Sequence, residues 1–207
     1  MPPPSPTPIT GCNQLGAYGL GQTVQGYQLK DTWQFGMTAT QTFANVLKAS
    51  QAVIIAEAVM DYVPGLDAKF TGGPVGLGNL YEAPGATLGG TPSLGGYPQF
   101  PGVVTPSDQF PTATSWGYVL LGRLEYDNLI AAWNVLPRVV WSQDVNGVSP
   151  GPGGNFIKGR HAATFGVEGN LRNTWVLDVS YSHYGGAEQF NLLSDRDFVS
   201  FVAKYSF

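Results

Sequence analysis

The chain has 207 residues, of which 43% are hydrophobic and 13% aromatic, while only 12% are charged. This composition excludes an intrinsically disordered chain, because disordered segments are poor in aromatic residues and rich in charge. The formal net charge of −4 provides no basic surface of the kind that nucleic acid binding requires, so nucleic acid is not an expected partner. The many glycines and prolines instead suit an all-β protein with long loops.

Residues 1–26 are rich first in proline and then in glycine and glutamine, and they show no clean periodicity. They are predicted to form a loop or linker, with one weak strand within residues 15–24 as the alternative. The segment lacks the basic residues, the apolar run and the cleavage site of an export signal. Either the chain is not exported, or its true beginning, which carries the signal, is missing, and we favour the missing beginning. We expect residues 27–207 to form a transmembrane β-barrel segment.

From residue 28 onward, apolar and polar residues alternate with a period of two, which predicts β-strands with one apolar face. Seven such segments are separated by turn or loop sequences. They cover residues 28–43, 50–62, 114–128, 133–144, 160–172, 175–182 and 197–207. No helical periodicity competes, and no run approaches the roughly 20 apolar residues of a transmembrane helix. The sequence therefore predicts an all-β fold, an antiparallel up-and-down meander of seven or eight long strands.

The predicted connections alternate between short and long. The short ones lie near residues 45, 129 and 173, and the long ones cover residues 63–113, 145–159 and 185–196. This alternation is typical of outer-membrane β-barrels, which have short periplasmic turns and longer extracellular loops. The long segment at residues 63–113 is a candidate lid or inward plug.

The last predicted strand ends on Tyr205 and Phe207, with apolar residues alternating to the chain end. Its eleven residues match the roughly 9–11 that a tilted transmembrane strand needs. Such an aromatic end resembles the closing strand of bacterial outer-membrane barrels, so the barrel-assembly machinery is an expected partner.

Aromatic residues gather at both ends of the predicted apolar faces. On the sixth strand, for example, Trp175 and Tyr181 bracket Leu177 and Val179. Tryptophan and tyrosine favour the two lipid–water interfaces of a membrane, so this pattern predicts a transmembrane barrel in contact with the outer-membrane bilayer. The alternative is a soluble ligand-binding β-sandwich. The predicted lipid-facing girdle consists of Trp33, Phe35, Phe43, Tyr62, Trp116, Tyr118, Tyr126, Trp133, Trp141, Trp175 and Tyr181.

Seven clear strands do not fit a complete barrel. Bacterial barrels have an even number of strands, and an open sheet edge in lipid would leave backbone N–H and C=O groups unpaired. Either residues 12–25 supply an eighth strand, or the chain is the C-terminal part of a larger barrel. We favour the larger barrel. Pro137 lies in the middle of a predicted strand, where its missing N–H implies a bulge or a locally unpaired position.

The polar faces of the predicted strands carry charges of both signs, which can pair across strands or form a channel lining that screens solutes. Apolar residues interrupt them, so an amphipathic or hydrophobic solute is the expected cargo. The predicted lumen-facing polar residues are Lys30, Gln34, Glu57, Arg123, Glu125, Asp127, Arg138, Glu168, Asp178 and Lys204. The apolar residues on the same face are Val53, Ile55, Val119, Leu121, Val140 and Val176.

Little in the sequence indicates catalysis. His161 and His183 are predicted at outer strand ends, have no evident base partner in the sequence and lack the third ligand of a zinc site. The segment from Asp144 to Gly147 resembles the start of a calcium loop but lacks the downstream glutamate. We therefore expect no catalytic residue, cofactor or metal. The alternative, an outer-membrane lipase or protease, requires a serine close to the histidines.

Two stretches are similar to one proteobacterial family. Residues 144–156 read Asp-Val-Asn-Gly-Val-Ser-Pro-Gly-Pro-Gly-Gly-Asn-Phe, and residues 195–207 run from Asp-Arg-Asp-Phe-Val to Lys-Tyr-Ser-Phe. Both resemble the domain of unknown function thirteen-oh-two, as do residues 26–33, 115–118 and 191–197. The resemblance implies a Gram-negative outer-membrane barrel longer than this chain, with the chain as its C-terminal part. It implies no established substrate and no catalytic residue.

Overall fold

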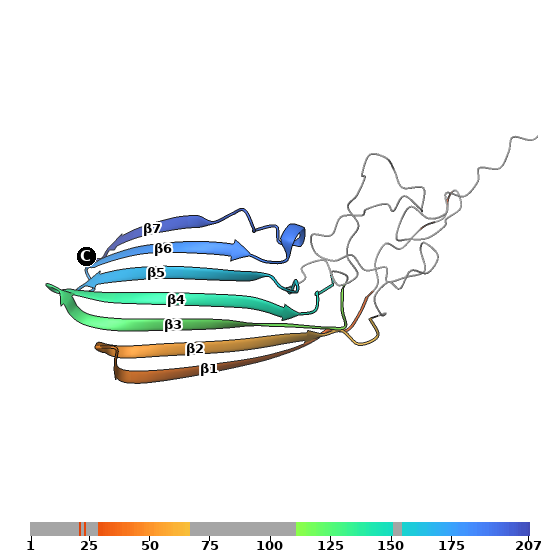
Figure 1. Cartoon of the computed structure of the whole chain (residues 1–207), viewed down its shortest axis with the longest axis horizontal. Helices are drawn as coiled ribbons and strands as arrows, with labels where there is room; N and C mark the ends of the chain where they lie inside the picture. Colours follow the sequence, from red (N-terminus) through yellow and green to blue (C-terminus); the bar gives the residue numbers. More distant parts are fainter. Residues whose placement is uncertain (1–20, 22, 24–28, 67–110, 151–154) are drawn as a thin grey trace, which may run out of the picture.

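Seven strands form a single sheet whose order follows the sequence (Figure 1). They are β1 (Trp33–Val46), β2 (Ala49–Tyr62), β3 (Thr114–Ile130), β4 (Trp133–Asn146), β5 (His161–Leu171), β6 (Trp175–Gly185) and β7 (Phe198–Tyr205). Every neighbouring pair is antiparallel, so the predicted all-β meander is confirmed. One short 3-10 helix, η3 (Glu188–Phe190), lies between β6 and β7.

The computed structural model describes residues 21, 23, 29–66, 111–150 and 155–207. The predicted linker at residues 1–26, with its alternative strand, lies outside the described residues except at positions 21 and 23. Most of the candidate lid at residues 63–113 also lies outside them. Within the described part of the chain, no helix is long and apolar enough to span a bilayer.

The first and last strands are shorter than the alternation predicts, because a strand extends only as far as its partner. Strand β1 begins at Trp33, which pairs with Tyr62 at the end of β2. Strand β7 ends at Tyr205, which pairs with Trp175 at the start of β6. The predicted starts at residues 28 and 197 and the predicted end at Phe207 are therefore wrong by a few residues.

All short connections lie at one end of the sheet and all long ones at the other, as the alternation predicts (Figure 1). The turn between β1 and β2 consists of Leu47 and Lys48, whose φ angles are 53° and 65°. Two successive residues with positive φ form the hairpin turn that follows the right-handed twist of the strands. The short connections fix the register of the two strands that each of them joins.

The register joins the apolar faces of the seven strands into one surface. In one row across the sheet, Val139 of β4 pairs with Phe165 of β5, which pairs with Tyr181 of β6. In the adjacent row, Arg138 pairs with Gly166, and Gly166 with Ser180. Because side chains alternate between faces, a slip of one residue would mix these rows. We call the two surfaces the outer face, which is apolar, and the inner face, which carries the charges.

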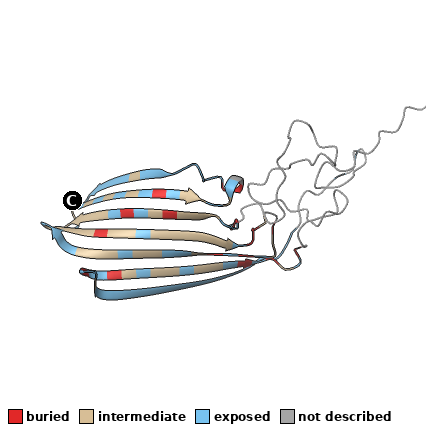
Figure 2. Ribbon diagram, in the orientation of Figure 1, coloured by how far each residue is buried: buried red, intermediate tan, exposed pale blue. Residues whose placement is uncertain are grey.

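The described residues form one layer, so large apolar side chains on the outer face remain uncovered. Phe165 is 58% exposed and Phe201 is 67% exposed. Figure 2 shows that β1, at one edge of the sheet, is exposed along almost its whole length. Buried apolar residues gather instead at the long-connection end, where Val148 and Phe156 are almost completely covered.

Pro137 produces the irregularity that its position predicts. Toward β5 the register runs without a break through the pair of Pro137 and Val167. Toward β3 the pairing stops at Arg138 and resumes at Val135. The unpaired position therefore lies on the β3 side, where the proline ring offers no N–H to the ladder.

Candidate functional site

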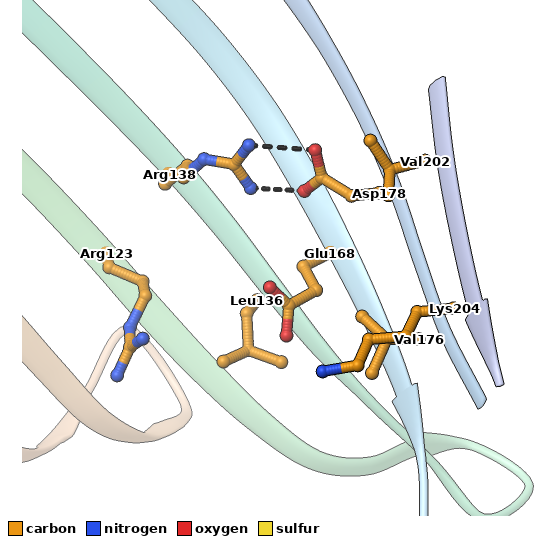
Figure 3. Close-up of a pocket in the computed structure, with 8 residues that line it drawn as sticks. All are labelled: Arg123, Leu136, Arg138, Glu168, Val176, Asp178, Val202 and Lys204. Atoms are coloured by element: carbon orange, nitrogen blue, oxygen red, sulfur yellow. Dashed lines mark hydrogen bonds and ion pairs between the residues drawn. The ribbon is translucent and has the colours of Figure 1, made fainter. Parts of the chain in front are cut away.

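The inner face contains a hollow of about 360 Å³ on β3–β7, in the half of the sheet near the short connections (Figure 3). Five charged residues and three aliphatic ones line it. They are Arg123, Arg138, Glu168, Asp178, Lys204, Leu136, Val176 and Val202. We call it the inner hollow. It brings together five of the ten polar residues that the sequence assigns to the lumen.

Two arginines face each other in the inner hollow. Arg123 of β3 pairs directly with Arg138 of β4, and like charges opposite one another are destabilising. The side chain of Arg138 extends instead across β5 and reaches Asp178 on β6 (Figure 3). The two residues therefore lie on strands that are not neighbours in the sheet.

The pair of Arg138 and Asp178 is bidentate. Nη2 of the guanidinium donates to Oδ1 at 2.9 Å, and Nη1 donates to Oδ2. Gly166 makes this possible, because a Cβ at that position would lie 2.7 Å from the Arg138 Cζ. The side chains of the pair are only 25% and 16% exposed, so the interaction is partly shielded from water. Two parallel charge-assisted hydrogen bonds fix both the position and the orientation of the guanidinium.

The other two cationic side chains of the inner hollow have no partner among the described residues. Within the described residues, the side chains of Arg123 and Lys204 make no ion pair and no hydrogen bond, and both are exposed. Leu136 is 8% exposed and forms an apolar floor beside Glu168. The inner hollow thus offers free charges around an aliphatic patch, an arrangement that suits an amphipathic molecule.

The remaining predicted lumen residues also lie on the inner face or at its edge. Glu57 pairs with Thr38 on that face. Glu125 and Asp127 lie two and four residues after Arg123 on β3, so the alternation of side chains puts them on the same side. Lys30 precedes β1, and its ammonium donates to the Gly65 carbonyl at 2.7 Å.

Gln34 binds Asp61, a residue that the sequence did not single out as functional. Its amide nitrogen donates to the Asp61 carboxylate at 2.9 Å. Asp61 is 6% exposed and also accepts hydrogen bonds from Asn155 and Ser149. An acidic residue just before the end of a strand looks like an ordinary solvated group. Its burial depends on a loop that comes much later in the chain.

On the outer face, the register sorts the girdle residues into two rows. The row in the half of the sheet near the long connections consists of Trp33, Phe35, Tyr62, Trp116, Tyr118, Trp141 and Tyr181. The row near the short turns consists of Phe43, Tyr126, Trp133 and Trp175. The rings of Trp175 and Tyr205 lie 4.7 Å apart in the second row. Mainly aliphatic residues lie between the rows, as two membrane interfaces would require.

The structure corrects one expectation, because His183 does have a carboxylate partner. Its Nδ1 lies 2.7 Å from Oδ2 of Asp197, which directly precedes β7. The backbone N–H of Tyr184 and the hydroxyl of Tyr181 also donate to this carboxylate. These hydrogen bonds, led by that of His183, lower the pKa of Asp197 from 3.8 to about 2. His183 and Asp197 are 14 positions apart in the sequence and come into contact only when β6 and β7 pair, so the contact could not be predicted from the sequence.

The histidines nevertheless do not form a recognisable catalytic or metal site. His161 stacks on Trp141 with ring centroids 5.3 Å apart, and its Nδ1 lies near the Gly159 carbonyl. Ser182, the residue before His183, points to the inner face and hydrogen-bonds to Thr164. Within residues 29–66, 111–150 and 155–207, no serine hydroxyl binds either histidine. The same residues contain no group of three or more His, Cys, Asp or Glu side chains that could hold a metal ion.

The chain matches no curated protein and no solved structure. A family model described as a protein of unknown function, DUF1302, matches residues 3–207. This match covers almost the whole chain, and it agrees with the resemblance of the Pro/Gly-rich and C-terminal stretches. The chain therefore belongs to the DUF1302 family of proteins of unknown function.

Proposed function

We propose that the sheet is part of a β-barrel in the outer membrane of a Gram-negative bacterium, and that its inner face lines a path or binding site for small amphipathic or hydrophobic solutes. No catalysis is involved. The observation that supports this most strongly is the register. It places every apolar face, with its two aromatic rows, on one uncovered side of the sheet, and the charges on the other.

The uncovered outer face is the main physical argument for a bilayer. Exposed apolar surface in water costs about 25 cal/mol per Å² relative to burial. Soluble monomers rarely leave a contiguous patch of more than a few hundred Å². A face that includes Phe165, Val167, Val179 and Phe201, all at least 48% exposed, avoids this cost if lipid chains cover it.

The two edges of the sheet support closure into a barrel. In lipid, the unpaired N–H and C=O groups of an edge strand cost several kcal/mol each, so both β1 and β7 need partners. Because every step in the sheet is antiparallel, β1 and β7 run in the same direction. A fully antiparallel closure therefore requires an odd number of further strands between them.

The inner hollow supports the choice of solute. Its aliphatic floor at Leu136 can accept an apolar body, and the free charges of Arg123 and Lys204 can contact a polar group. Conduction requires binding that is favourable enough for entry and weak enough for release. The outer-membrane bilayer and the barrel-assembly machinery are the partners we propose.

Transport by the complete protein in proteoliposomes tests this proposal. Naphthalene-2-sulfonate is a suitable probe because it is fluorescent, amphipathic and permanently charged, so it crosses a lipid bilayer slowly unaided. We expect it to leave loaded proteoliposomes faster than protein-free liposomes. Leu136→Asp should slow its release, because the new charge disrupts the apolar floor of the inner hollow. Thr38→Asp is the matched control, since Thr38 lies on the same face but outside the hollow.

Release no faster than from protein-free liposomes would refute the proposed transport. A protein that folds and remains monomeric in buffer without detergent would refute the membrane location and favour the soluble sandwich.

A further inference from the structure

The connection between β4 and β5 folds back over the inner face. Its described residues are 147–150 and 155–160, which we call the mouth connection. Val148 and Ile157 form an antiparallel bridge with each other, and they are 0% and 5% exposed. Ser149, which follows Val148, and Phe156, which precedes Ile157, are also buried. A loop with this much buried backbone is a packed element of the fold.

Polar contacts attach the mouth connection to β2 and β3. Asp61 of β2 accepts hydrogen bonds from Asn155 Nδ2 at 3.3 Å and from Ser149 Oγ at 3.5 Å. The Ser149 hydroxyl lies 2.9 Å from that of Ser115 on β3, and it accepts the backbone N–H of Phe156. Asp61 and Ser115 pair with each other at inner-face positions, so the connection must lie on the inner side of the sheet.

An apolar contact also places the mouth connection on the inner side of the sheet. A Cβ at Gly117 would lie 3.0 Å from Cε1 of Phe156. Gly117 occupies an inner-face position on β3, two residues after Ser115. The Phe156 ring therefore packs on the inner surface of β3 in the space that the missing side chain leaves.

A carboxylate fixes the other side of the mouth connection. Oδ2 of Asp144, near the end of β4, accepts the backbone N–H of Ile157 at 2.9 Å and Arg160 Nε at 2.7 Å. Arg160 also donates to the carbonyl of Asn155. The connection is thus tied to β2, to β3 and to the end of β4.

We infer that the mouth connection is a permanent constriction at the long-connection end of the solute path, and that Phe156 and Asp61 set the size of solute that passes. The inference rests on the proposed function, because a constriction needs a path to narrow. Loops that extend away from a sheet leave its inner space open. This one occupies that space with buried side chains and with hydrogen bonds to three carboxylate or hydroxyl anchors.

Two anionic probes of different size test the inference. Release of naphthalene-2-sulfonate and of the larger pyrene-1-sulfonate is measured from proteoliposomes that contain the complete protein. Phe156→Ala removes the ring over Gly117, and Asp61→Ala removes the acceptor for Gln34, Ser149 and Asn155. Both variants should raise the ratio of pyrene to naphthalene release above that of the wild type.

Matched controls separate size from charge and from general damage. Glu57→Ala removes the same charge from the inner face of β2, and Phe165→Ala removes an aromatic ring from the outer face. Neither residue contacts the mouth connection, so both variants should keep the wild-type ratio. If Phe156→Ala and Asp61→Ala also keep it, the inference is wrong although the proposed function stands. If the wild-type protein releases neither probe, the proposed function itself fails.

A crosslink tests whether the constriction is permanent, and it requires no truncation of a side chain. Cysteines replace Ser115 and Ser149, whose hydroxyls lie 2.9 Å apart, in a Cys12→Ser background. Only a small shift would bring the two sulfurs to the bonding distance of about 2.05 Å. We expect equal release ratios for the oxidised and reduced protein. A higher ratio after reduction would show that the connection opens, which would overturn a permanent constriction.

Discussion

Arg138 and Asp178 form a bidentate ion pair across an intervening strand, over the bare backbone of Gly166. This contact draws Arg138 away from Arg123, the like charge directly opposite it. One arginine of the facing pair is thereby held in a structural ion pair, while Arg123 makes no ion pair within the described residues. The structural interpretation of the inner-face charges therefore applies to Arg138 and Asp178, and under the proposed function Arg123 is the arginine that contacts the solute.

Breaking this ion pair should destabilise the fold. Asp178→Asn and Arg138→Met should each lower the free energy of unfolding by about 2 kcal/mol, a value between those of exposed and fully buried pairs. Urea unfolding of the protein in detergent micelles, followed by tryptophan fluorescence, measures the change. The double variant should lose less than the sum of the two single variants. Additive losses would show that the two side chains do not interact.

Gly166→Ala should have a similar effect without removing a charge. The new methyl group would lie 2.7 Å from the Arg138 Cζ and would displace the guanidinium from Asp178. In this background, Asp178→Asn should cost much less than in the wild type. Gly36→Ala is the control, because its methyl group would meet just one side-chain atom, at 3.8 Å. Equal losses for the two alanine variants would contradict a specific role for Gly166.

The Asp197 carboxylate should make stability depend on pH. Its hydrogen bonds to His183, Tyr184 and Tyr181 lower its pKa to about 2 in the folded protein, below the ordinary value of 3.8. A lowered pKa stabilises the fold above pH 4, and that stabilisation is lost as the pH falls from about 4 to about 2. Wild type should therefore be more stable than Asp197→Asn at pH 6, and the difference should shrink through this window.

Asp195→Asn is the control for that experiment, since Asp195 is 89% exposed and its nearest cation lies 4.0 Å away. Its unfolding curve should follow that of the wild type at both ends of the pH range. A constant difference between wild type and Asp197→Asn from pH 6 to pH 2 would show that the carboxylate has an ordinary pKa.

Phe207 should matter for assembly and little for folded stability. It lies two residues after Tyr205, the last residue of β7, and is fully exposed, so the folded sheet loses almost nothing without its ring. We expect Phe207→Ala to reduce the amount of protein assembled in the outer membrane of cells while urea unfolding of the refolded protein is unchanged. Phe201→Ala, inside β7, is the control for a simple loss of an aromatic ring. Normal assembly of Phe207→Ala would show that the barrel-assembly machinery does not read this residue.

The sheet could be predicted from the sequence because its signal is local. Alternation over a strand such as β6 shows which side chains share a face, and glycine and proline mark where the strand must end. The position of Pro137 even predicted an unpaired site, since a missing N–H has the same effect in any sheet. Strand ends were less exact, because the end of β7 depends on where β6 begins.

Contacts between distant segments could not be predicted in this way. The pairing of His183 with Asp197 depends on the register of β6 and β7, and the burial of Asp61 depends on a loop that follows two strands later. Alternation shows that Arg138 and Asp178 share a face, but not that a glycine between them leaves room for a direct contact. These contacts depend on how the strands pair. The periodicity of one sequence shows the two faces of each strand, but it does not show the register between strands.

Spin labels along β6 test the central proposal most directly, namely that the outer face touches lipid and the inner face touches water. Single cysteines in a Cys12→Ser background would carry nitroxide labels at successive positions from Leu177 to Ser182, in the protein reconstituted into bilayers. Relaxation by oxygen, which concentrates in hydrocarbon, should be strongest at Leu177, Val179 and Tyr181. Relaxation by a water-soluble nickel complex should be strongest at the positions between them. If both reagents reach every position equally, or if the order is reversed, the apolar face does not contact the bilayer and the proposed transport function fails with it.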